Sequence, residues 1–105
     1  MADSRKYKVV VSDKAKQQLG THMRFLSNVD KKAAVNLKHK ILDVLRTLEV
    51  LPERYPFFNE LFIPSNKYHK MVIEKRYMVL YQIKDNMVYV DHILDCRQDY
   101  NWLIH

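Results

Sequence analysis

The sequence predicts an α+β domain: an N-terminal strand, an antiparallel two-helix hairpin packed on a mainly antiparallel sheet of four or five strands, and a short C-terminal helix. Apolar residues recur at helical spacing in two segments of the first half of the chain. After Pro52 the pattern changes to short segments rich in Val, Ile, Tyr and Met, which favour strands. A chain of 105 residues has room for one core, so we expect a single domain over residues 1–105.

The first two expected elements are a strand over Lys6–Ser12 and a helix that follows it. The strand contains Tyr7 and three consecutive valines, which are aromatic or β-branched. Ser12 and Asp13 suit a helix cap. The helix has apolar positions at helical spacing: Ala15, Leu19, His22 or Met23, and Leu26. Gly20, the only glycine, lies inside this helix and weakens it, because glycine costs about 1 kcal/mol relative to alanine there.

A second helix is expected after a break at Asn28–Lys31, with Asp30 placed to cap it. Its apolar stripe is Ala34, Leu37, Ile41, Val44 or Leu45, and Leu48, and most of its charged residues fall outside that stripe. Pro52 ends the helix within a few residues of Leu51. Because the loop between the two helices is very short, they must pack as an antiparallel hairpin.

The second half of the chain is expected to be extended. Residues 60–63 form a short candidate strand, and three longer strands follow: Tyr68–Glu74, Tyr77–Lys84 and Met87–Leu94. Lys84-Asp85-Asn86 is a compact hairpin turn between the last two. A short helix is expected over Asp99–His105.

The positive charge of the chain is confined to its first half. The formal net charge is +6 and the isoelectric point is about 9.5. Residues 1–54 contain 12 Lys and Arg against 6 Asp and Glu, whereas residues 55–105 contain 6 of each. The basic helices therefore either bind an anionic partner such as RNA phosphates or keep a small protein soluble. Any catalysis by residues 55–105 must depend on a few individually positioned side chains, because this half has no net charge.

Several function classes are excluded by composition. No run approaches the roughly 20 apolar residues that span a bilayer, and Met1–Lys6 lacks the apolar core of a secretory signal. We therefore expect a cytoplasmic protein with no membrane partner. The lone Cys96 and the scattered histidines show no metal-binding pattern, and one glycine cannot build a phosphate-binding loop. No metal and no cofactor are expected.

Four short patterns follow one another after the predicted helices. They are Leu51-Pro52-Glu53-Arg54-Tyr55-Pro56, Tyr68-His69-Lys70-Met71, Tyr77-Met78-Val79-Leu80-Tyr81-Gln82-Ile83, and the segment Met87–Asp99 with its Arg97-Gln98-Asp99 end. Each alone is a degenerate pattern, but the four in this order over residues 6–102 resemble the RelE/ParE toxins of type II toxin–antitoxin systems. The chain is accordingly identified as a member of that superfamily.

The resemblance implies a toxin that arrests growth and is held by a cognate antitoxin, whose helix and extended segment lie across the toxin's helices and sheet. Operator DNA is then bound only through the antitoxin. RelE-like members cleave mRNA on the ribosome without a metal, and ParE-like members inhibit DNA gyrase without being nucleases. Our first hypothesis from the sequence is a ribosome-dependent endoribonuclease, an mRNA interferase. The alternatives are a gyrase inhibitor and a degenerate member that acts only in an antitoxin–operator repressor complex.

The resemblance also places candidate catalytic residues. RelE-like nucleases use basic side chains of the central strands, an arginine at the end of the last strand and often a terminal aromatic residue. Lys70, Arg97, His69 and Tyr100 match those positions. RNA cleavage would need them as a base, an acid and cations at the phosphate.

This chain also departs from the nuclease pattern. Met78 and Val72 stand where such enzymes often have basic residues, and His69 replaces an arginine. Lys70 alternatively is a solvated strand lysine, Arg97 a partner of Asp95 or Asp99, and His69 an exposed polar residue. His92 is more simply a satisfied sheet histidine. A cluster of four apolar side chains after the helices forms either a core plug or part of an antitoxin groove: Phe57, Phe58, Leu61 and Phe62.

Overall fold

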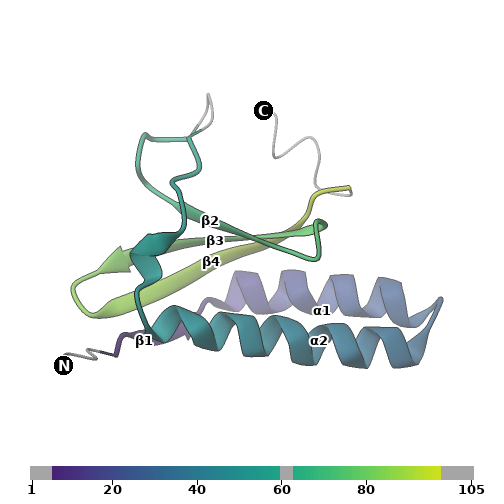
Figure 1. Ribbon diagram of the computed structural model, residues 1–105. Coiled ribbons are helices and arrows are strands. Elements are labelled where there is room, and N and C mark those ends of the chain that lie inside the picture. The colour runs from purple at the N-terminus through teal and green to yellow at the C-terminus, as the bar shows by residue number, and fades with distance from the viewer. Residues whose placement is uncertain (1–5, 60–62, 98–105) are drawn as a thin grey trace.

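The computed structural model describes residues 6–59 and 63–97 and has the predicted α+β architecture, a helical layer against one face of a sheet (Figure 1). Residues 56–58 lie beside the edge of the strand His69–Ile73, where Phe57 forms an antiparallel bridge with His69. The elements are β1 (Lys8–Val11), α1 (Asp13–Ser27), α2 (Lys31–Arg46), the 3-10 turns η1 (Thr47–Glu49) and η2 (Pro52–Arg54), β2 (His69–Ile73), β3 (Tyr77–Lys84) and β4 (Met87–Asp95). No helix in the described ranges is both long and apolar enough to cross a membrane.

The two helices begin where their capping residues predict. The Ser12 Oγ accepts a hydrogen bond from the Ala15 N–H, and the Asp30 Oδ1 accepts one from the Ala33 N–H, each at 3.0 Å. Such caps satisfy backbone donors that have no partner inside the helix and stabilise it by about 1 kcal/mol. Gly20 does not interrupt α1, which continues to Ser27.

The sheet has the order β1-β4-β3-β2 in the part of the chain that the structure describes. Strands β2, β3 and β4 form an antiparallel meander, while β1 lies parallel to β4 at one edge. Residues 60–62 of the additional expected strand lie outside the described residues, and Ile63 is in a bend. The expected C-terminal helix over 99–105 also lies outside them.

The central strand β3 has apolar side chains on both faces, so the sheet carries two cores. Alternate residues point to opposite sides of a strand. Tyr77, Val79 and Tyr81 belong to the main core under the helices, with Ile41 and Leu48. The second core lies on the outer face of the sheet and consists of Phe58, Tyr68, Met78, Leu80 and Leu94. It fixes the segment that precedes β2 onto the sheet.

The turn between β2 and β3 holds two non-glycine residues in the left-handed conformation, Glu74 at φ 57° and Lys75 at φ 58°. This conformation costs an L-residue roughly 1–2 kcal/mol, and glycine avoids the cost. We expect Lys75→Gly to raise the free energy of unfolding by about 1 kcal/mol, measured by urea denaturation, while leaving the Glu74 ion pair with Lys40 in place. Lys84→Gly, at the end of β3 where φ is not positive, should instead lower it. Equal effects of the two glycines would contradict the assignment of strain to Lys75.

Candidate functional site

The register between β2 and β3 places two of the candidate residues on opposite faces of the sheet. His69 pairs with Tyr81, which belongs to the main core under the helices. Lys70 pairs with Leu80, which belongs to the second core on the outer face. Consecutive residues of a strand cannot share a face, so the structure does not bring these two side chains together.

His69 lies inside the protein and is held from three sides. Its side chain is 8% exposed. The ring lies 4.2 Å from the Phe57 ring and is stacked on Tyr81 at 5.3 Å between centroids. Its Nδ1 lies 2.7 Å from the Tyr55 carbonyl oxygen and donates to it, because a carbonyl can only accept. These contacts tie the chain after η2 to β2.

Lys70 and Arg97 lie at different levels of the sheet. Lys70 is half-buried, and its ammonium lies 5.8 Å from the centre of the Phe58 ring. In the strand register it is level with Leu80 and His92. Arg97 is exposed and lies in the turn after β4. That strand ends at Asp95, three residues beyond His92, about 10 Å further along the strand at roughly 3.3 Å per residue. Tyr100 lies outside the described residues.

Arg97 nevertheless contacts Asp95, through its backbone. The Arg97 N–H donates to the Asp95 Oδ1 at 2.9 Å. The other carboxylate oxygen of Asp95 accepts from Arg76, with the Nε at 3.1 Å and the NH2 at 3.0 Å. This leaves the Arg97 guanidinium exposed at the end of the sheet, where it can meet an anion or a partner.

A polar cluster that sequence analysis did not find lies at the β-bulge between β3 and β4. Asp91 is the extra residue there, because Leu80 pairs with His92 and Tyr81 with Val90. The Gln82 Nε2 donates to the Asp91 Oδ2 at 2.6 Å, and the Tyr68 hydroxyl donates to the same carboxylate. An aspartate inside a strand is the one sequence signal for such a feature, since aspartate is depleted in strands.

In this cluster the pKa values of Tyr68 and His92 are both shifted in the direction that favours the neutral form. Burial, reinforced by Asp91, raises the pKa of Tyr68. Burial, followed by the nearby Lys14 ammonium, lowers the pKa of His92. The Gln18 side chain holds both the His92 ring, at 3.5 Å from its Nδ1, and the Ile93 N–H, at 2.8 Å. The network joins α1 to the sheet.

Metal chemistry has no donor set in the described part of the chain. No group of three or more His, Cys, Asp or Glu residues there is arranged to hold a metal ion. Cys96 packs at the side of the second core, where it serves as a small apolar side chain.

Comparisons with known proteins identify the family and the fold of this chain. The family model described as the ParE toxin of a type II toxin-antitoxin system, parDE, matches residues 9–100. A solved structure described as the chromosomal ParDE TA system from P. aeruginosa matches with a TM-score of 0.72 and 12% sequence identity. The match covers 88% of this chain and 98% of that chain, and at this identity it shows a shared fold. No curated protein sequence matches the chain.

Proposed function

Since the chain belongs to the ParE toxin family of type II toxin–antitoxin systems, we propose that it arrests growth by inhibiting DNA gyrase and that it does not cleave RNA. The cognate antitoxin is the partner that such a system implies. The proposal replaces our first hypothesis from the sequence, a ribosome-dependent nuclease, with its alternative.

The observation that carries the proposal is the dispersal of the candidate catalytic groups. Acid–base cleavage of RNA needs a base within about 3 Å of the ribose hydroxyl, together with an acid and cations at the same phosphate. The His69 side chain faces the helices, and its Nδ1 donates a hydrogen bond to the Tyr55 carbonyl oxygen, whereas the Lys70 side chain is on the outer face of the sheet. Arg97 follows the end of β4, whereas Lys70 lies level with His92 within that strand. This arrangement suits binding to a protein target better than a shared catalytic centre.

Two measurements on one toxin test the proposal. We expect the purified chain to block supercoiling of relaxed plasmid by DNA gyrase, and its induction in cells to leave the 5′ ends of transcripts unchanged. Arg97→Ala should weaken the block without altering the fold, because its exposed guanidinium is removed while the backbone N–H bond to Asp95 remains.

The opposite pattern would overturn the proposal. New transcript ends inside translated codons that vanish in Arg97→Ala would support the nuclease. Supercoiling that proceeds normally with excess toxin would also reject gyrase as the target. Absence of growth arrest, combined with tight binding of the antitoxin, would favour the repressor alternative.

A further inference from the structure

The outer edge of β4 is covered by a strand along only part of its length. In the sheet of the described ranges, β1 pairs with β4 over Met87–Val90, whereas β4 continues to Asp95. The chain leaves the sheet at Ser12, whose N–H donates to the Val90 carbonyl at 2.9 Å, and then enters α1. An uncovered strand edge presents N–H and C=O groups on which another chain can form a strand. Residues 91–95 therefore require another kind of cover.

Side chains of α1 and of its cap provide this cover. The Ser12 hydroxyl donates to the Asp91 carbonyl at 3.2 Å. The Gln18 Oε1 accepts from the Ile93 N–H at 2.8 Å. The His22 Nε2 lies 2.8 Å from the carbonyl oxygen of Ile93 and donates to it, because a carbonyl can only accept. Both backbone groups of Ile93 are thus paired with side chains, in the way that a neighbouring strand would pair them with its backbone.

The positions of Gln18 and His22 follow from helical geometry. Residues four apart lie on the same side of a helix, and this side also carries Ala15 and Leu19 into the main core. His22 is 5% exposed. A polar side chain on a buried face costs free energy unless it has a hydrogen-bond partner, and the Ile93 backbone is that partner. The edge of β4 therefore explains why a histidine stands where the helical spacing suits an apolar residue.

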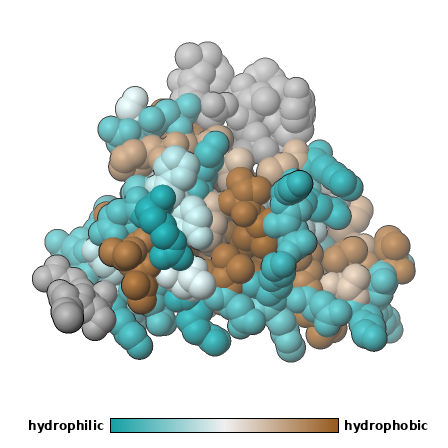
Figure 2. Space-filling view, viewed as in Figure 1, coloured by the Kyte–Doolittle hydropathy of each residue, from teal (hydrophilic) through white to brown (hydrophobic). Residues whose placement is uncertain are grey.

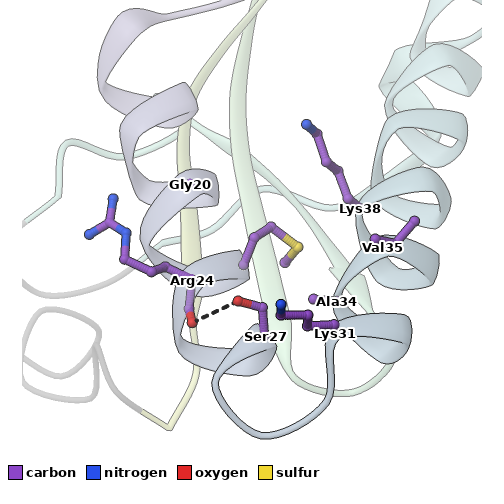
Figure 3. A pocket seen from close by; sticks show the side chains of 8 residues that line it. Gly20, Arg24, Ser27, Lys31, Ala34, Val35 and Lys38 are labelled. Atoms are coloured by element: carbon purple, nitrogen blue, oxygen red, sulfur yellow. Dashed lines mark hydrogen bonds between the residues drawn. The ribbon is translucent and has the colours of Figure 1, made fainter.

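Other parts of the helical layer meet the sheet differently. The α2 helix packs on the main core with apolar side chains such as Leu37 and Val44, and apolar surface is visible between that helix and the sheet (Figure 2). Another side of α1, which includes Gly20 and Arg24, lines a groove of about 410 Å³ toward α2 (Figure 3). The hydrogen bonds to β4 thus come from one face of α1, and the groove lies on another.

We propose that Ser12, Gln18 and His22 form an edge guard, which takes the place of a further strand over residues 91–93. The guard prevents the β4 edge from pairing with a second copy of this chain. It acts on the assembly state of the protein and not on a target, so the proposal does not depend on whether the toxin inhibits gyrase or cleaves RNA.

The edge that a second copy offers to β4 is the free edge of β2. The Lys70 N–H points outward, since it donates to the Pro56 carbonyl at 2.9 Å. Backbone groups of alternate residues point to the same side of a strand, so the Val72 N–H points outward as well. Val72 is 50% exposed. Lys70 on β2 and Asp91 on β4 carry opposite charges, which favours this pairing. Because two different edges are joined, the contact does not close and would build open-ended polymers.

Amide hydrogen exchange of the full-length chain, followed by NMR, tests the cover directly. Gln18→Ala removes the acceptor of the Ile93 N–H and should speed exchange of that amide about tenfold, because local opening then exposes it without unfolding of the chain. The Val79 amide, in the central strand, should keep its rate. Gln18→Glu retains an acceptor oxygen and should leave the Ile93 amide protected. Gln17→Ala, an exposed position on the same helix, is the matched control and should also leave it protected.

Sedimentation and light scattering test what the guard excludes. The unaltered chain should sediment as a monomer. Gln18→Ala combined with His22→Ala should form polymers whose mass grows with concentration, whereas His22→Gln, which keeps a side-chain N–H donor, should remain a monomer. Val72→Pro, added to the double variant, should return it to a monomer, because proline removes the outward N–H of β2 and is tolerated at a sheet edge.

Three results would contradict the edge guard. Unchanged exchange of the Ile93 amide in Gln18→Ala would show that this side chain does not cover the edge. Equal acceleration at Ile93 and Val79 would show that Gln18 only stabilises the fold as a whole. Polymers of the double variant that persist with Val72→Pro would show that β2 is not the edge that pairs with β4.

Discussion

Replacing Arg76 with alanine is expected to lower the free energy of unfolding by about 3 kcal/mol, because it removes an ion pair and two hydrogen bonds from the buried Asp95 carboxylate. The Asp95 side chain is 1% exposed and lies 3.0 Å from the Arg76 NH2. The Arg76 side chain is 30% exposed, so some water can reach the carboxylate after the substitution. The loss should therefore lie at the lower end of the 3–5 kcal/mol that is typical of a broken buried pair.

Arg97→Ala is the matched control for this prediction. Arg97 also contacts Asp95, but it does so through its backbone N–H, which alanine retains. Its removal should change the free energy of unfolding by less than about 0.5 kcal/mol. The two variants are compared by urea denaturation at neutral pH. A similar small loss in both would show that Arg76 is not needed to hold Asp95 in the core.

The pairing of Arg76 with Asp95 illustrates what sequence reasoning misses. It arises from the β3–β4 register, in which Tyr77 lies opposite Asp95. The register depends on a bulge at Asp91, for which an aspartate inside a strand pattern is only a weak local signal. The sequence pattern points instead to Arg97 as one possible partner of Asp95, and the structure supports this contact only for the Arg97 backbone N–H.

Local signals, in contrast, predicted much of the fold. Ser12 and Asp30 cap the two helices as expected, and β3 spans the predicted Tyr77–Lys84. These features depend on neighbours within a few residues. The parallel pairing of β1 with β4 joins residues about 80 positions apart, and the sequence carries no local signal for it.

The candidate site was predicted less well than the fold, for a physical reason. A one-residue change of register exchanges the two faces of a strand. The sequence alone therefore does not determine which face of the sheet His69 and Lys70 each point to; the pairing of β2 with β3 does. His69 turned out to face the helices and to bind the Tyr55 carbonyl. A resemblance that matches residues by position gives no information about the direction of their side chains.

The adjacent residues Phe57 and Phe58 give the second large prediction. Phe58 is 7% exposed and belongs to the second core, whereas Phe57 is 43% exposed and its ring packs at a tilt against His69. Phe58→Ala should lower the free energy of unfolding by about 3–4 kcal/mol, since it removes a buried aromatic ring and leaves a cavity over Leu80. Phe57→Ala should cost about 1 kcal/mol, because that ring is already partly exposed to solvent and its ring contact is with His69.

Equilibrium urea denaturation of the two variants measures this difference. A domain of this size has a total stability of about 5–15 kcal/mol, so Phe58→Ala should also reduce growth arrest at 37 °C, whereas Phe57→Ala should retain it. Of the two roles that the sequence left open for this cluster, Phe58 is then a core plug, and Phe57 remains available to a partner. Equal destabilisation by the two substitutions would mean that the second core does not hold this segment on the sheet.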